Sequence, residues 1–163
     1  MKALRVTGIG AAAVLGMLAL HQLVSALMSR GHKADLPRHG RVPDFAFVSE
    51  RGRAVAARDL EGKAWIADFV FTRCGGSCPM MSERMAALAV ELRDVPGVRF
   101  VSFDVDPERD SLADLAAYSR QHRADPERWM FLRGEKPAVR SLAGEGFKLA
   151  VEDGHDDDPE PIL

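Results

Sequence analysis

Residues 69–88 read FVFTRCGGSCPMMSERMAAL and contain both cysteines of the chain, Cys74 and Cys78. The apolar run AWIADFVFT leads up to the cysteines and is typical of a strand that is buried on both faces. After the cysteines, apolar residues recur at helical spacing: Met81, Met85, Leu88 and Leu92. Pro79 suits the first turn of a helix. The stretch therefore predicts a strand that ends just before the cysteines and a helix that begins just after them.

Strand and helix patterns alternate along the rest of the chain. FAFVSERGRAVA indicates two short strands around a glycine turn, and VRFVSFDV indicates a second buried strand. SLADLAAYSRQH predicts a helix that Ser111 caps, with Asp114 three residues on, and WMFLRG, PAVRSLAGE and FKLAV predict a strand, a short helix and a last short strand. This alternation predicts an α/β fold with a largely parallel central sheet and flanking helices. Ligands of such sheets bind beyond the carboxyl ends of the strands, where Cys74 and Cys78 fall.

The N-terminus carries a long apolar run from Val6 to Met28, preceded by Lys2 and Arg5. About 20 apolar residues span a bilayer as a helix, and basic residues before such a run keep the N-terminus in the cytoplasm. We therefore expect residues 1–30 to form a single-pass transmembrane anchor in the inner (cytoplasmic) membrane, with the domain facing the periplasm. The alternative is a cleaved signal peptide with Gly8 to Leu20 as its apolar core and VSA as its cleavage site. In either case the domain is exported to a compartment where paired thiols can form a disulfide.

Composition sets the expected domain boundaries. SRGHKADLPRHGRVPDF is polar and punctuated by Gly and Pro, so we expect residues 31–43 to be a linker and residues 44–163 to be one domain.

The formal net charge of −2 gives no reason to expect a nucleic-acid partner. His155 in the acidic run EDGHDDDPE could bind a divalent ion, but the run does not match the calcium-loop pattern. The preferred interpretation of the acidic run is therefore a solvated loop.

Three features of the cysteine pair favour chemistry over core packing. The positive end of the following helix, together with Arg73, would lower the pKa of a thiol. A spacing of four on a helical turn places the two Cα atoms about 6 Å apart, which a disulfide can bridge. Gly75 and Gly76 allow the backbone to bend so that both sulfurs face one point. Two inert, buried cysteines would explain neither the pairing nor the glycines.

The chain has too few thiolates for structural zinc, which takes four protein ligands. Two thiolates with one imidazole suit Cu(I), a soft ion of low coordination number. The other possibility is a metal-free dithiol that cycles with a disulfide, although the spacing exceeds C-x-x-C by one residue. Soft thioether donors also follow the cysteines, but their helical spacing favours core packing: Met80, Met81 and Met85. His122 lies in a predicted helix and is expected to be a surface residue.

Two motifs together resemble those of the Sco/SenC family of copper-binding, thioredoxin-like proteins. The first, C-x-x-x-C-P after an apolar strand, comprises Cys74, Cys78 and Pro79. The second, D-x-D-P-x-x-D after the next strand, comprises Asp104, Asp106, Pro107 and Asp110. The resemblance runs from about Pro43 to the end of the chain. GGS between the cysteines departs from the Pro-Asp of many members but leaves the ligand positions untouched.

The resemblance implies a membrane-tethered copper chaperone for the assembly of the copper site of cytochrome c oxidase. Cys74 and Cys78 would ligate the copper and form a reversible disulfide. The partner would be the copper-bearing subunit of the oxidase or another copper chaperone. Asp104 and Asp106 could place charge behind the copper ligands or, with Asp110, form a docking surface. The preferred interpretation is a loop whose acids cap the following helix and face solvent.

The resemblance also implies more chain than the sequence contains. In similar proteins a histidine ligand, further strands and a closing helix follow the point at which this chain reads DPEPIL. We therefore expect a thioredoxin-like sheet without its last strands and helix, and a site without a histidine unless His155 moves in. Two sulfurs alone would favour Cu(I) over Cu(II). Three functions stay open: a copper chaperone, a thiol–disulfide oxidoreductase, and an inactive truncated product.

Overall fold

The computed structural model describes residues 14, 16–22 and 37–150, which belong to two units, Met1–His39 and Gly40–Leu163. Residues 14 and 16–22 are helical and exposed. No helix within these described ranges has the length and apolar character needed to cross a membrane. Most of the predicted anchor, Val6 to Met28, lies outside the described residues.

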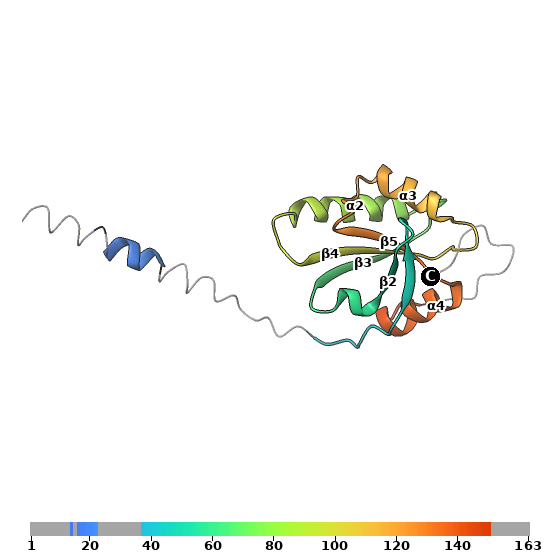
Figure 1. Ribbon diagram of the computed structural model, residues 1–163, viewed down its shortest axis with the longest axis horizontal. Coiled ribbons are helices and arrows are strands. Elements are labelled where there is room, and N and C mark those ends of the chain that lie inside the picture. Colours follow the sequence, from blue (N-terminus) through green and yellow to red (C-terminus); the bar gives the residue numbers. More distant parts are fainter. Residues whose placement is uncertain (1–13, 15, 23–36, 151–163) are drawn as a thin grey trace, which may run out of the picture. The chain divides into compact units, whose positions relative to one another are not determined.

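Five strands of the second unit form one mixed sheet in the order β2-β1-β5-β4-β3 (Figure 1). They are β1 (Ala46–Ser49), β2 (Ala54–Ala56), β3 (Ala64–Val70), β4 (Val98–Asp104) and β5 (Trp129–Arg133). β3, β4 and β5 run parallel, whereas β1 pairs antiparallel with both β2 and β5. The prediction of a largely parallel sheet is therefore wrong for β1 and β2. Gly52, with a φ of +76°, turns this segment into a hairpin, and the hairpin pairs with β5.

Helices cover both faces of the sheet, with α2 and α3 on one side and α4 on the other (Figure 1). They are η1 (Ala57–Leu60), α2 (Cys78–Glu91), α3 (Leu112–Gln121), α4 (Lys136–Ser141) and the π-helical turn η2 (Leu142–Gly146). The predicted cap of α3 is confirmed, because the Asp114 amide donates to Ser111 Oγ at 3.2 Å and the Ser111 amide donates to Asp114 Oδ2 at 2.9 Å. The predicted strand FKLAV is wrong over residues 147–150. Lys148 has a φ of +58° and interrupts any extended run, and Phe147 packs against the core instead.

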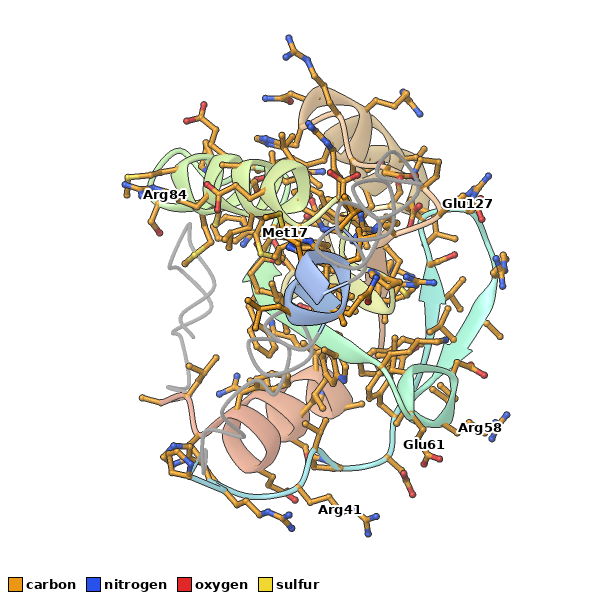
Figure 2. All side chains as sticks on the ribbon, turned by 90° about the vertical axis from the view of Figure 1, so that its left-hand side faces the viewer. Met17, Arg41, Arg58, Glu61, Arg84 and Glu127 are labelled. Atoms are coloured by element: carbon orange, nitrogen blue, oxygen red, sulfur yellow. The ribbon has the colours of Figure 1, made fainter. Side chains whose placement is uncertain are left out.

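Alternate residues of the central strands pack into two separate cores. The charged side chains of Arg58, Arg84 and Glu127 are exposed and point outward (Figure 2). In β4, Phe100 belongs to the core under α2 and α3, whereas Val101 and Phe103 belong to the core on the α4 side. The ring of Phe103 is fully buried, and its centroid lies 5.4–6.2 Å from those of Phe45, Phe47, Trp65, Phe69 and Phe147. This aromatic cluster joins β1, β3 and β4 to the residue that ends η2.

The segment AWIADFVFT forms β3 as predicted, but at an edge of the described sheet. Trp65, Ile66 and Phe69 are only half-buried, so the prediction of a strand buried on both faces is wrong for these positions. Val70 and Phe71 at the carboxyl end are buried, and the Val105 amide donates to the Val70 carbonyl at 2.9 Å. The end of β3 is therefore anchored where the loop to the cysteines begins.

Candidate metal centre

Cys74 and Cys78 lie beyond the carboxyl end of β3. Cys74 is in the loop four residues after Val70, and Cys78 is the first residue of α2. The Cys78 amide donates to Cys74 Sγ at 3.4 Å. The two cysteines form no disulfide; Cys74 is half-buried and Cys78 is buried. The structure thus brings the two candidate ligands together in a site that solvent reaches from the Cys74 side.

The pKa of Cys78 moves in the opposite direction from the prediction. Burial, and after it the hydrogen bond with Cys74, raises the pKa of the Cys78 thiol from 9.0 to about 12. The positive charge of Arg73 is engaged elsewhere, since its Nη2 donates to the Arg109 carbonyl at 2.7 Å and its Nε lies 4.0 Å from Asp110 Oδ1. The prediction of a lowered pKa is therefore wrong for Cys78. This thiol therefore stays neutral near pH 7. It loses its proton only when it binds a metal ion or takes part in thiol–disulfide exchange.

The residues between the two cysteines are exposed. Gly75 and Gly76 have no positive φ, and a methyl group added at either would meet open space, so the bend of this loop does not require glycine. Met85 is buried as predicted. Met80 and Met81 are 62% and 49% exposed, so the prediction of core packing is wrong for these two. The cysteine loop thus presents bare backbone, and the first turn of α2 presents two thioether side chains that a partner can contact.

The aspartates of the D-x-D-P-x-x-D motif are buried, contrary to the prediction of a solvent-facing loop. None of these three takes part in the cap of α3. The acid in that cap is Asp114, which accepts the Ser111 amide. Asp104 Oδ1 accepts the Asp106 amide at 3.0 Å, and Asp106 Oδ2 lies 2.6 Å from Arg109 Nε. Asp104 and Asp106 therefore stabilise the turn that follows β4 through contacts within their own loop.

Asp110, the third aspartate of the motif, contacts the cysteine loop. Its two carboxylate oxygens accept the amide and the hydroxyl of Thr72, each at 2.6 Å. Sequence reasoning did not single out this pair. The signal was available, since neighbouring parallel strands end at the same edge of a sheet and the loops after β3 and β4 must therefore meet.

Burial of Asp104 gives the folded protein a pH dependence. Burial, opposed by the Asp106 amide, raises the pKa of Asp104 from 3.8 to about 7. Between these values the folded protein keeps a proton that the unfolded chain has lost, so the free energy of unfolding falls as the pH rises from about 4 to about 7. We expect Asp104→Asn to remove up to about 4 kcal/mol of this decrease. Urea unfolding of both proteins at pH 4.5 and pH 7.5 measures it, and equal decreases in the two would contradict the assignment.

A buried polar cluster lies on the α2–α3 side of the sheet. Ser102 Oγ donates to Asp68 Oδ1 at 2.6 Å and accepts from Trp129 Nε1 at 2.9 Å. Ser82 Oγ and Tyr118 OH lie 2.9 Å apart in the same core. Burial raises the pKa of Asp68 to about 6. Asp68 is a further buried residue that was not predicted, although a charged residue within an apolar strand is itself a sign of a buried hydrogen bond.

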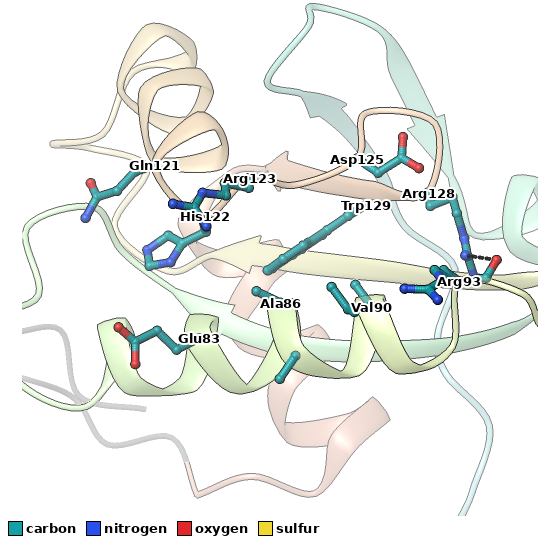
Figure 3. A pocket seen from close by; sticks show the side chains of 12 residues that line it. Glu83, Ala86, Val90, Arg93, Gln121, His122, Arg123, Asp125, Arg128 and Trp129 are labelled. Atoms are coloured by element: carbon teal, nitrogen blue, oxygen red, sulfur yellow. Dashed lines mark hydrogen bonds between the residues drawn. The ribbon is translucent and has the colours of Figure 1, made fainter.

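A hollow of about 690 Å³ lies between α2 and α3, and neither cysteine lines it (Figure 3). Its walls include Val90 and Trp129, and Glu83 is among its charged lining residues. His122 also lines it and is half-buried, so the prediction of an ordinary surface residue is wrong. Burial lowers the pKa of His122, and its ring lies 4.5 Å from that of Tyr118. His122, directly after α3, thus takes part in the packing between the helices.

His155 lies outside the described residues, together with the rest of the acidic run at 152–160. Within residues 14, 16–22 and 37–150, no three side chains among His, Cys, Asp and Glu are placed to share one metal ion. As far as the structure describes it, the candidate centre therefore consists of Cys74 and Cys78.

Comparisons with known proteins point to one family. The sequence model of SCO1/SenC proteins matches residues 34–161. The SCO1 protein homolog of Bacillus subtilis (strain 168) is 32% identical over 124 residues, which cover 75% of this chain and 64% of that protein. The chain thus spans less than two thirds of the length of this relative.

Solved structures show the same architecture. BsSco, described as a Sco-family cytochrome c oxidase assembly protein with a disulfide switch, has a TM-score of 0.68 and 31% identity over 75% of this chain and 72% of that one. Arabidopsis thaliana ScoI with copper bound has a TM-score of 0.56 and 25% identity over 71% of this chain and 72% of that one. With the mixed sheet and its flanking helices, these likenesses confirm a thioredoxin-like α/β fold.

Proposed function

The chain belongs to the SCO1/SenC family, and on that basis we propose that it binds copper through Cys74 and Cys78 for the assembly of cytochrome c oxidase. The main support is the pair of reduced cysteines that meet beyond β3, one half-buried and one buried. BsSco is a cytochrome c oxidase assembly protein, and a related Arabidopsis structure contains copper. The partner that this function requires is the copper-bearing oxidase subunit or another copper chaperone.

The donor set suits copper better than zinc. Structural zinc sites use four protein ligands, and the described residues hold no larger cluster of His, Cys, Asp and Glu around the cysteines. Two thiolates match the softness and the low coordination number of Cu(I). The half-buried position of Cys74 leaves a path by which an ion can enter and leave, as delivery to a partner requires.

Titration of the reduced chain with Cu(I) tests this function. We expect one copper ion per chain, with thiolate-to-copper charge-transfer absorption in the ultraviolet, and weaker binding of Cu(II). Because the Cys78 proton must leave and its pKa is about 12, the Cu(I) affinity should rise at least about tenfold per pH unit between pH 6 and 8. Competition with a chromophoric Cu(I) chelator measures this slope. Absence of charge transfer, or an affinity that does not change with pH, would refute ligation by this pair.

The proposed function places the domain outside the cytoplasm, with residues 1–30 as its anchor in the inner membrane. Support comes from the length of the apolar run Val6 to Met28 and from Lys2 and Arg5 before it. We expect a C-terminal alkaline phosphatase fusion to be active and a β-galactosidase fusion to be inactive. The reverse pattern would contradict export. N-terminal sequencing of the mature protein separates an anchor from a signal peptide, since a start near Leu27 means cleavage.

A second function, thiol–disulfide exchange, is favoured by the unequal exposure of the two sulfurs. The Cys74 thiolate could attack a partner disulfide and release one partner thiol. Cys78, after losing its proton, would then attack Cys74, form the intramolecular disulfide and release the second partner thiol. If the copper-free chain reduces a disulfide-containing peptide stoichiometrically, this activity is supported. If the chain binds Cu(I) but reduces no such peptide, the activity is excluded.

A further inference from the structure

We propose that Asp110 is the positioning residue of the cysteine pair, which it acts on through Thr72. Its carboxylate fixes the loop that carries Cys74, and the fixed loop keeps Cys74 opposite Cys78. The copper readout of this proposal rests on the proposed function, whereas its disulfide readout does not.

The contact between Asp110 and Thr72 uses the whole carboxylate. Thr72 N donates to Oδ2 and Thr72 Oγ1 donates to Oδ1, and both distances are 2.6 Å. The Asp110 side chain is fully buried. Short hydrogen bonds to a carboxylate are among the stronger ones in proteins, and two of them fix direction as well as distance. Thr72 therefore has one defined position relative to the loop after β4.

Asp110 is itself held from two sides. Its amide donates to the Asp106 carbonyl at 2.9 Å, and its carbonyl accepts Arg133 Nε at 2.9 Å. Arg133 also donates to the Pro107 carbonyl and belongs to β5. The loop at 106–110 is therefore bound to the sheet and provides a rigid support. Arg73 adds a second tie to this support through the Arg109 carbonyl.

The two cysteines depend on this support unequally. Cys78 belongs to α2, which is packed into the core through Met85 and Ser82. Cys74 belongs to the connecting loop, and Thr72 lies two residues before it. Without the Asp110 contact, bringing Cys74 to a shared ion or to a disulfide would require ordering this loop each time. A preorganised loop avoids that cost.

Four variants of the chain separate a positioning role of Asp110 from an effect of its charge. Asp110→Ala removes both acceptors, and Thr72→Val removes the hydroxyl bond while keeping the side-chain shape. Asp110→Asn keeps both contacts without charge, because the amide oxygen can accept the Thr72 N–H and the amide nitrogen can donate to the hydroxyl. Thr72→Ser keeps both contacts as well. Val139→Ala, in the buried part of α4, is the control for loss of stability alone.

Chelator competition should show that Asp110→Ala lowers the Cu(I) affinity roughly 10–100-fold. We expect a smaller loss for Thr72→Val and near wild-type affinity for Asp110→Asn, Thr72→Ser and Val139→Ala. If Asp110→Asn lost as much Cu(I) affinity as Asp110→Ala, the charge of Asp110 and not its hydrogen bonds would be responsible, and the positioning role would be overturned. If Val139→Ala lost as much Cu(I) affinity as Asp110→Ala, the effect would come from lower stability of the fold and not from positioning. Wild-type affinity in Thr72→Val would also overturn the proposal, even if Asp110→Ala failed to fold.

The disulfide equilibrium provides the second readout and needs no copper. In a glutathione buffer, one oxidised glutathione converts the two thiols to the Cys74–Cys78 disulfide and yields two reduced glutathiones. Loss of positioning makes the protein disulfide less favourable, so the equilibrium constant should fall in the same order of variants. If the wild-type chain binds no Cu(I), the proposed function fails while this series still tests Asp110. Equal constants in all variants would overturn the positioning role.

Discussion

Cys74→Ser and Cys78→Ser should each abolish high-affinity Cu(I) binding while the chain stays folded. A hydroxyl nearly fills the volume of a thiol but is a poor ligand for a soft ion. Removal of one of two sulfur ligands takes away a large part of the binding free energy. Because about 1.4 kcal/mol corresponds to a factor of ten, we expect the affinity to fall more than about a thousandfold.

Chelator competition on the reduced proteins measures this loss, and circular dichroism checks the fold. Met80→Leu is the matched control, because Met80 is an exposed sulfur residue two positions after Cys78. It should bind Cu(I) as the wild type does if the cysteines alone hold the ion. Wild-type affinity in both serine variants would show that the site lies elsewhere.

Phe103→Ala should cause the largest loss of stability of any single substitution considered for this chain. The ring is completely buried and meets five other aromatic rings, which come from β1, the residue before β1, β3 and the residue after η2. Truncation of a buried Phe to Ala costs about 3–5 kcal/mol, because apolar contacts are lost and a cavity remains. Total stabilities of domains this size are about 5–15 kcal/mol, so the variant would lose a large fraction.

Guanidinium unfolding followed by tryptophan fluorescence measures the loss, since Trp65 packs on this ring. Phe103→Leu should cost less, because most of the volume is kept. Val95→Ala, at an exposed position, should change the free energy of unfolding by less than about 0.5 kcal/mol. A Phe103→Ala loss no larger than that of Val95→Ala would mean that the aromatic cluster does not hold the sheet together.

The local elements of the fold could be read from the sequence because their signals act over short distances. The apolar run before Cys74 and the helical spacing after Cys78 predict β3 and α2 correctly. Ser111 and Asp114 predict the start of α3, since capping involves residues three positions apart. The same short-range signals place the cysteine pair at a strand–helix junction, and the two motifs identify the family.

The three-dimensional arrangement decided the properties that depend on residues distant in the chain. The hairpin joins β5 about eighty residues away, and no local pattern specifies whether that pairing is parallel or antiparallel. Burial of Asp104 and the exposure of Met80 depend on what packs above them, which helical or strand periodicity does not encode. The raised pKa of Cys78 has the same cause, because desolvation is a property of the assembled core.

The candidate site contains one feature that follows from neighbouring residues in the chain and one that follows from the fold. Cys74 and Cys78 must lie together in any fold, because four residues of chain cannot separate them widely. The contact by which Asp110 holds Thr72 beside them spans 38 positions of sequence, so it depends on how the chain folds. That contact exists because β3 and β4 are parallel neighbours whose carboxyl ends meet, and strand pairing is settled by the packing of the whole sheet.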